Sequence, residues 1–202
     1  MRMSDSIRVG IVGSKFAAAF HMACYARLGN AVEIAGVFSE TPTHCNTFAD
    51  RHGIQAFSTF AELADKVDVI DICAPGYVHE FYAVEAARAG KHVIVEKPFT
   101  GYFGPGNAGE TWKGDTFPKE KMLEGAMESA RRMVTTASEH RVKLCYAENW
   151  VYAPSIQKEA EILRATGGQI LWMQGEESHS GSHSPAYGIW GNAGSGSLVG
   201  KG

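Results

Sequence analysis

The sequence predicts an α/β protein with a doubly wound parallel sheet, followed by the start of a second, truncated α/β domain with an open sheet. Three observations support this prediction. Short β-branched apolar runs alternate with helical stretches up to about residue 147, which is typical of βαβ units. A glycine turn directly follows the first run, as in Rossmann-type folds. After the alternation stops, the chain contains only one more good strand pattern.

The elements of the first domain are expected in a regular order. Apolar runs predict strands over residues 7–12, 32–38, 67–73, 92–96 and 143–147. Helical spacing predicts helices over 16–28, 42–53, 78–89 and 119–140. A capping-box pattern at Thr59 and Glu62 predicts a small helix before the third strand. The segment 101–118 is rich in glycine, proline and aromatic residues, and we expect a long loop there.

The same patterns predict which side chains are buried. The first helix is expected to use its apolar residues Phe16, Phe20, Cys24 and Leu28. The helix over 119–140 is expected to use Met122, Leu123, Ala126, Met127, Ala130, Met133 and Val134. Asp68 and Asp71 alternate with apolar residues in the third strand, so we expect both near solvent.

Beyond residue 148 the pattern changes, and we place a domain boundary there. Residues 1–148 form the first domain, with the loop 101–118 as an insertion, and residues 149–202 begin the second. A helix over 155–165 and an amphipathic strand over 169–177 are expected in this second part. One strand is not enough for a sheet. We therefore expect the second domain to be incomplete and the chain to be the front part of a longer protein.

Composition excludes several function classes. Lysine and arginine total 19 against 22 acidic residues, a formal charge of −3, so no basic field is available for nucleic acid or anionic lipid. The amino terminus resembles neither a signal peptide nor a membrane span. The cysteines are far apart and show no C-x-x-C spacing, which predicts buried thiols in a cytoplasmic protein and no metal cluster: Cys24, Cys45, Cys73 and Cys145.

The first chemical motif is the turn after the first strand. A dinucleotide fold uses G-x-G-x-x-G here, so that backbone amides at a helix N-terminus approach a pyrophosphate. Only the first glycine is present, because Lys15 and Ala18 occupy the second and third positions. We predict cofactor contacts from Gly13, Ser14, Lys15, Phe16 and Ala17. A tight βα turn in an unrelated α/β fold remains the alternative for this motif.

Two further strand ends carry polar side chains. Ser39 and Glu40 follow the second strand, where an acidic residue would hold a ribose diol, and this favours NAD slightly over NADP. Glu96-Lys97-Pro98 leaves the strand over 92–96, and the preceding strand ends at Ala74-Pro75 with His79 just beyond. Ligands of open α/β sheets bind beyond the carboxyl ends of strands. We therefore predict a cofactor site from these residues.

At these residues the chain resembles the glucose–fructose oxidoreductase/inositol dehydrogenase (Gfo/Idh/MocA) family. The resemblance rests on IRVGIVG, His21, the segment VDVIDICAPGYVHEFYAVEAARAGKHVIVEKPF and the crossover at YAENW. It implies an NAD(P)-binding Rossmann domain and a second domain whose open sheet covers the site. In such a site Lys97 would be the catalytic residue that positions and activates a substrate hydroxyl. Asn149 and His183 would be substrate contacts.

The sequence also departs from the family pattern. A downstream aspartate and histidine complete the family's site, but Gly200 stands where the aspartate is expected and no histidine follows it. His179 and His183 lie in a Ser/Gly-rich segment, where metal binding ranks below a substrate-loop role and both rank below a solvated loop. The family commonly pairs through the second-domain sheet, so we expect a homo-oligomer.

The functional prediction is an NAD(P)-dependent oxidoreductase acting on a hydroxyl-bearing carbon of a sugar, cyclitol or similar polyol. Two alternatives stay open. A non-catalytic dinucleotide-binding sensor is favoured by Lys15, Gly200 and the absent histidine, whereas Lys97 favours the enzyme. The second is a family member that uses NAD transiently to cleave a glycosidic bond, which these residues do not exclude.

Overall fold

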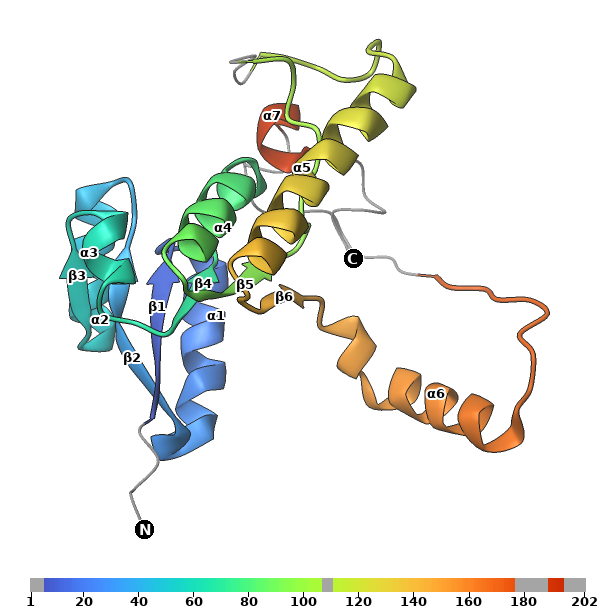
Figure 1. Cartoon of the computed structure of the whole chain (residues 1–202), viewed down its shortest axis with the longest axis horizontal. Coiled ribbons are helices and arrows are strands. Elements are labelled where there is room, and N and C mark those ends of the chain that lie inside the picture. Colours follow the sequence, from blue (N-terminus) through green and yellow to red (C-terminus); the bar gives the residue numbers. More distant parts are fainter. Residues whose placement is uncertain (1–5, 107–110, 177–188, 195–202) are drawn as a thin grey trace.

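The computed structural model describes residues 6–106, 111–176 and 189–194 of the 202-residue chain. Six parallel strands form one sheet in the order β3-β2-β1-β4-β5-β6 (Figure 1). The strands are β1 Ile7–Val12, β2 Val32–Phe38, β3 Gln55–Phe57, β4 Val69–Ile72, β5 His92–Glu96 and β6 Leu144–Ala147. The strand order reverses between β1 and β4, so the predicted doubly wound Rossmann topology is confirmed.

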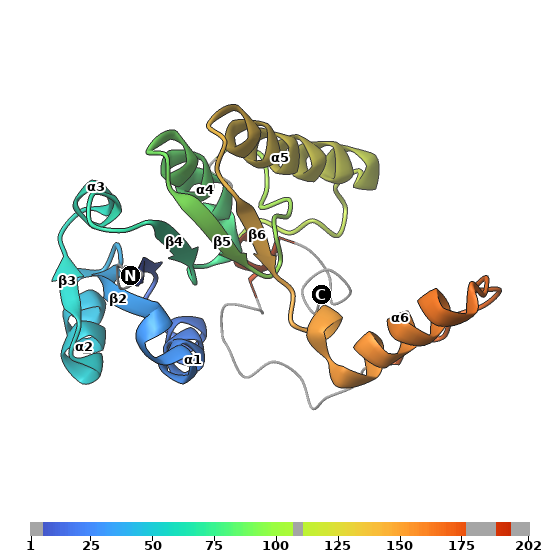
Figure 2. The ribbon, with the colours of Figure 1, turned by 60° about the horizontal axis from the view of Figure 1, so that its bottom comes forward.

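Helices cover both faces of this sheet, as Figure 2 shows. One face carries α1 (Phe16–Tyr25) and α2 (Pro42–His52). The other carries α3 (Phe60–Ala64), α4 (His79–Arg88) and α5 (Lys119–Glu139). Short 3-10 turns follow α1 (η1, Ala26–Ala31), precede α4 (η2, Gly76–Val78) and follow β6 (η3, Trp150–Tyr152).

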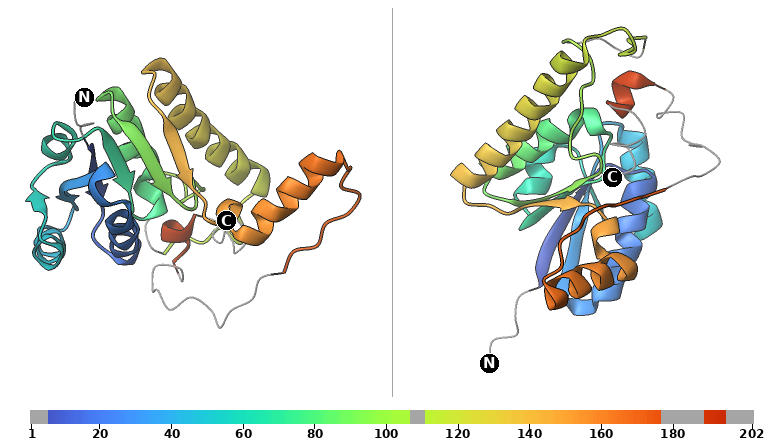
Figure 3. Two further views of the ribbon diagram at one scale, coloured as in Figure 1. Left: turned by 90° about the horizontal axis from the view of Figure 1, so that it is seen from below. Right: turned by 90° about the vertical axis from the view of Figure 1, so that its right-hand side faces the viewer.

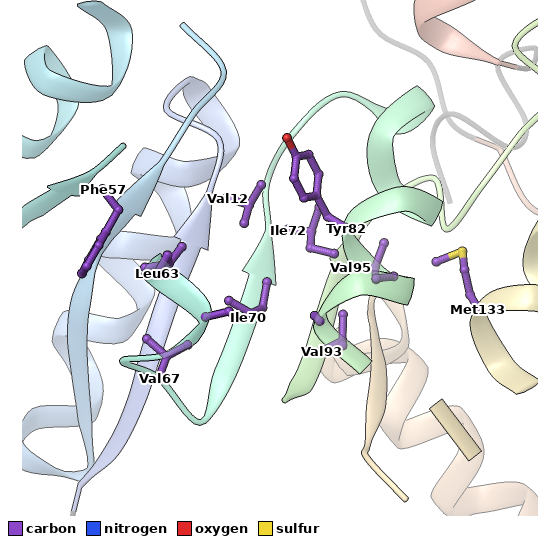
Figure 4. Packing of buried hydrophobic residues seen from close by; sticks show 13 residues of the cluster. Val12, Phe57, Leu63, Val67, Ile70, Ile72, Tyr82, Val93, Val95 and Met133 are labelled. Atoms are coloured by element: carbon purple, nitrogen blue, oxygen red, sulfur yellow. The ribbon is translucent and has the colours of Figure 1, made fainter. Parts of the chain in front are cut away.

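The apolar core is divided between the two faces. On the α4 face, side chains of β4 and β5 pack against Leu63, Tyr82 and Met133 (Figure 4). On the α1 face, a smaller cluster joins Ile11, Val37, Ala18, Cys45, Phe48, Ala49 and Cys73. The strands therefore bury side chains in both directions, as their continuous apolar runs predict.

The prediction that the first helix buries Phe16, Phe20, Cys24 and Leu28 is wrong. Phe16 is 84% exposed, and Phe20, Cys24 and Leu28 are exposed as well. The helix packs instead through the small side chain of Ala18, because α1 approaches the sheet at its alanine stretch. Cys24 and Cys145 are exposed thiols, so the expectation of four buried cysteines holds only for Cys45 and Cys73.

Three other expectations need correction. No strand was expected over residues 55–57, but β3 lies there and pairs with β2. Three residues are too few to produce a clear period in the sequence. Asp71 is fully buried, whereas Asp68 is exposed as expected. The long helix α5 buries Ser129, Met133 and Ala137, because a helix lying over only one sheet edge needs a narrow contact stripe. Three residues of its predicted face are exposed: Leu123, Met127 and Val134.

The chain beyond Ala147 is less closely attached to the sheet. The helix α6 (Pro154–Thr166) has no buried residue and extends away from the sheet in Figure 3. The strand expected over 169–177 is wrong for its described part, because residues 169–176 form no regular element. A strand needs a neighbour for its hydrogen bonds, and no described strand lies beside this segment. Leu171 is 89% exposed as a result.

The loop after β5 has neither helix nor strand over 101–106 and 111–118, as predicted. It packs against α7 (Trp190–Ala193). The backbone N–H of Tyr102 donates to the carbonyl oxygen of Gly194 at 2.8 Å, and the rings of Trp112 and Trp190 lie edge to face with centroids 6.1 Å apart.

Candidate active site

The turn after β1 lets the backbone come close to the end of β4. Gly13 has a φ of +107°, and a Cβ at this position would lie 2.8 Å from the carbonyl oxygen of Cys73. Only glycine fits such a close approach. Lys15 is the N-cap of α1, and no described side chain caps the first turn of this helix. Its backbone N–H groups are therefore suited to bind an anion.

An open pocket lies at the carboxyl ends of β1, β2 and β4. Seven of the predicted cofactor residues line it: Gly13, Ser14, Lys15, Ser39, Glu40, Ala74 and Pro75. Phe16 and Ala17 lie in the first turn of α1, and His79, Glu96 and Lys97 lie outside the lining. The turn, the uncapped helix and the acidic strand end together fit a dinucleotide.

The carboxylate of Glu40 lines this pocket and is held in place by a hydrogen bond. The phenol of Tyr82 donates to Oε1 of Glu40 at 3.0 Å, and the hydroxyl of Ser14 donates to that of Ser39 at 3.1 Å. Burial, together with Glu40, raises the pKa of Tyr82, so its proton stays available. Tyr82 is a pocket residue that the sequence analysis missed, because a tyrosine in a helix carries no specific signal.

His79 joins the ends of two strands. Its ring nitrogens lie 2.8 Å from the carbonyl oxygen of Ala74 and 2.9 Å from that of Pro98. The residue is 1% exposed, and burial lowers its pKa despite these bonds. The structure thus places His79 against the backbone around Lys97, and its neutral ring, with one N–H, donates to one of these two carbonyl oxygens.

A buried polar cluster lies under the same strand ends on the α1 face. Oδ2 of Asp71 is 2.7 Å from Nδ1 of His21 and accepts the hydroxyl of Tyr25 at 2.8 Å. Nε2 of His21 is 3.1 Å from Oε1 of Glu96. The thiol of Cys73 donates to Oδ1 of Asp71 at 3.7 Å. Two carboxylates thus flank one imidazole ring.

The protonation states in this cluster follow from the partners. Burial alone would lower the pKa of His21, but hydrogen bonds to Asp71, Cys73 and Glu96 and the charge of Asp71 raise it to about 12. Burial and Asp71 also raise the pKa of Tyr25. Burial raises the pKa of Cys73 to about 12. The cluster therefore contains an imidazolium between two carboxylates, with a neutral phenol and a neutral thiol.

His21, Asp71 and Cys73 also bring potential metal-ligand atoms within 4.8 Å of one another. The hydrogen bonds within the cluster account for this proximity. For a metal to bind here, the His21 imidazolium and the Cys73 thiol would each have to lose a proton. These side chains are arranged to hydrogen-bond to one another.

The remaining predicted residues lie in the second part of the chain. Asn149 is exposed and precedes η3, just beyond the carboxyl end of β6. His179, His183 and Gly200 lie outside the described residues. No described helix is long and apolar enough to cross a membrane.

Residues 7–108 match the model of the Gfo/Idh/MocA oxidoreductase family, described by its NAD-binding Rossmann fold. The chain belongs to this family. The family resemblance and the nicotinamide dinucleotide predicted from the sequence are thereby confirmed. A Gfo/Idh/MocA Rossmann domain also explains why Gly13, the end of β2 and the end of β4 meet at one pocket.

Several proteins are similar to this Gfo/Idh/MocA chain. UDP-N-acetylglucosamine 3-dehydrogenase of Acidithiobacillus ferrooxidans is 33% identical over 94 residues, 46% of this chain and 29% of that protein. Inositol 2-dehydrogenase of Corynebacterium glutamicum is 34% identical over 101 residues, 48% of this chain and 30% of that protein.

Solved structures agree on the fold. The A. ferrooxidans enzyme has a TM-score of 0.61 at 25% identity, with 78% of this chain and 43% of that chain covered. A WlbA dehydrogenase from Bordetella pertussis, solved with NADH and UDP-GlcNAcA, has a TM-score of 0.64 at 21% identity, covering 80% of this chain and 42% of that chain. The matched region of the present chain thus spans less than half of these relatives.

Proposed function

We propose that this chain supplies the NAD(P)-binding domain and the catalytic lysine of an oxidoreductase acting on a CH–OH group of a sugar, a cyclitol or a similar polyol. A bound nicotinamide dinucleotide supplies the hydride chemistry. The observation that carries the proposal is the position of Lys97. It leaves β5 next to the end of β4, because Ile72 pairs with Val95, and the end of β4 forms one wall of the pocket.

The chain's own residues would divide the work along the pocket. The uncapped first turn of α1, with Lys15 beside it, would hold the pyrophosphate. Glu40, fixed by Tyr82, would accept the ribose diol and repel a 2′-phosphate, which favours NAD over NADP. Lys97 would donate a hydrogen bond to the substrate oxygen and stabilise the negative charge that grows there as hydride leaves.

The proposal extends to the rest of the protein. Relatives named as dehydrogenases of a nucleotide sugar and of inositol support a substrate with several hydroxyl groups. Asn149 and His183 are proposed as substrate contacts. We also propose a cytoplasmic protein that binds no nucleic acid and assembles as a homo-oligomer through the sheet of a second domain that begins near residue 149.

The test is turnover by the intact protein with NAD and with NADP across a panel of sugars and cyclitols, measured by nicotinamide absorbance. Lys97→Met should lower turnover by about 10²–10³-fold and leave the Kd for NADH nearly unchanged. Lys143→Met is the matched control, because Lys143 is exposed and lies before the amino end of β6, at the opposite end of the strands from Lys97. Near-normal turnover of Lys97→Met would refute the role of Lys97.

A sensor remains the second candidate, favoured by one observation. Lys15 is exposed where the dinucleotide motif has a glycine, and a cation there can replace part of the backbone cradle. A sensor would bind NADH in titration but reduce NAD with no member of the panel. Turnover of any polyol above the Lys97→Met background would decide for the enzyme.

A further inference from the structure

A chain of ion pairs links Glu96, the residue before Lys97, to the buried Asp71. Asp71, His21 and Glu96 come from β4, α1 and β5, and each ring nitrogen of His21 faces a carboxylate oxygen, at 2.7 Å and 3.1 Å. Both contacts require an N–H, so the ring bridges the two strands with its full hydrogen-bonding capacity. The sequence analysis uses His21 for the family resemblance, but nothing in the sequence shows that its ring bridges two strands.

The lower end of this chain is fixed. Asp71 is fully buried, and it accepts the Tyr25 hydroxyl in addition to His21. Apolar residues would fill this volume at least as well, because burying charges is costly even when they are paired. Packing alone therefore does not account for a charged side chain at the centre of an apolar strand.

The upper end of the chain leads to the site. Oε1 of Glu96 accepts from His21, and Oε2 accepts the backbone N–H of Lys97 at 2.8 Å. One carboxylate thus connects the buried chain to the backbone of the residue that we place at the substrate. Rotation of the Glu96 side chain would break both bonds together.

We propose that His21 is a positioning residue. Its ring links Glu96 to Asp71 and thereby fixes the direction in which Lys97 leaves β5. This inference rests on the proposed role of Lys97. On the other side of the segment, the His79 ring packs against the backbone, with Nδ1 2.9 Å from the carbonyl oxygen of Pro98. Loss of His21 releases one of these two attachments, so Lys97 should shift without the site collapsing. A displacement of about 1 Å in an active site can cost about 10²-fold in rate.

The experiment measures kcat and the Kd for NADH of the intact protein with His21→Gln and His21→Lys. Glutamine carries no charge and has both of its N–H donors on one nitrogen, and lysine keeps the positive charge without the rigid two-nitrogen bridge. We expect kcat to fall about 10- to 100-fold in each variant, with the Kd for NADH changed less than about threefold. His92→Gln, at the exposed amino end of the same strand, should keep the activity.

A double-mutant cycle separates positioning from general damage. If His21 acts through Lys97, His21→Gln should lower the residual turnover of Lys97→Met by less than about threefold. An equal loss in both backgrounds, or normal kcat in the single variants, would overturn the inference. Near-normal turnover of Lys97→Met would instead remove the proposed function of Lys97 on which it rests.

A spectroscopic measurement covers the case in which the His21 variants do not fold. In the ¹⁵N-labelled wild-type protein at pH 8.5, we expect the partly buried His21 ring to show protons on both nitrogens. A ring with one bare nitrogen at that pH could not bridge both carboxylates and would contradict the inference.

Discussion

The two faces of the sheet hold the same short segment by opposite chemistry. On the α1 face, Glu96 is bound by His21, whose pKa is raised to about 12 by the neighbouring carboxylates despite burial. On the α4 face, the carbonyl oxygen of Pro98 lies 2.9 Å from Nδ1 of His79, whose pKa is lowered by burial. One histidine works as a cation and the other as a neutral ring.

The difference shows that surroundings, and not residue type, decide what a buried histidine does. Two carboxylates offset the desolvation of the His21 cation, whereas two carbonyl oxygens do not offset it for His79. The segment around Lys97 is thus held between a charged support and a neutral one. Each support should fail under different conditions.

Breaking the charged support should have the largest effect. Asp71→Asn keeps the shape but leaves His21 without its buried counter-charge, and we expect the free energy of unfolding to fall by about 3–5 kcal/mol. Asp68→Asn is the matched control. It lies just before the same strand and binds Arg8 at the surface, so it should cost no more than about 1 kcal/mol. Urea unfolding at pH 7 measures both, and equal losses would contradict the comparison.

The pH dependence of stability should separate the two histidines. The folded pKa of His21 is raised, so its stabilisation is complete below the unfolded pKa of about 6.5 and is lost as the pH rises toward about 12. The folded pKa of His79 is lowered, so its stabilisation is complete above about 6.5 and is lost as the pH falls. Maximum stability is therefore expected near pH 6.5.

Urea unfolding at a series of pH values measures this optimum. Between pH 7 and 8, where Cys73 and Tyr25 are still mostly protonated in the unfolded chain, stability should fall by about 1 kcal/mol, a loss limited by partial solvent access to His21. Between pH 6.5 and 5.5 the loss should stay below about 1 kcal/mol. His21→Gln should remove the alkaline slope and His79→Gln the acidic one, and an unchanged slope in either variant would refute the assignment.

Two tyrosines sharpen the comparison at smaller scale. Tyr25→Phe removes a donor to the buried Asp71 and should cost about 1.5 kcal/mol in the free energy of unfolding. Tyr82→Phe removes a donor to the exposed Glu40 and should cost about 0.5 kcal/mol, because water replaces the bond. Thermal unfolding of the two variants tests this ranking. A larger loss of stability for Tyr82→Phe than for Tyr25→Phe would contradict it.

The fold of the first 147 residues could be predicted because its strands are buried on both faces. Such strands appear as short apolar runs, and βαβ connectivity then leaves few arrangements. The capping box at Thr59 and Glu62 is confirmed for the same reason, since its two reciprocal bonds are local. The strand expected over 169–177 was wrong because a strand depends on a neighbour that local sequence does not specify.

The candidate site was only partly predictable. Gly13 and Lys97 stand directly after strands and Glu40 two residues after one, and their positions follow from chain direction alone. The cluster of His21, Tyr25 and Asp71 needs the register of β1, β4 and β5, which brings together residues 46 and 50 positions apart. An acidic residue inside an apolar strand was the available signal, and placing Asp71 near solvent missed it.

The contact between the loop and α7 gives the protein its own optical reporter. Two indoles whose centroids are 6.1 Å apart, with ring planes at 85°, couple their electronic transitions. Trp150 and Trp172 are exposed and reachable by an aqueous quencher. The Trp112–Trp190 pair should therefore dominate the near-ultraviolet dichroism and the unquenched emission, so detachment of residues 189–194 can be followed without any added label.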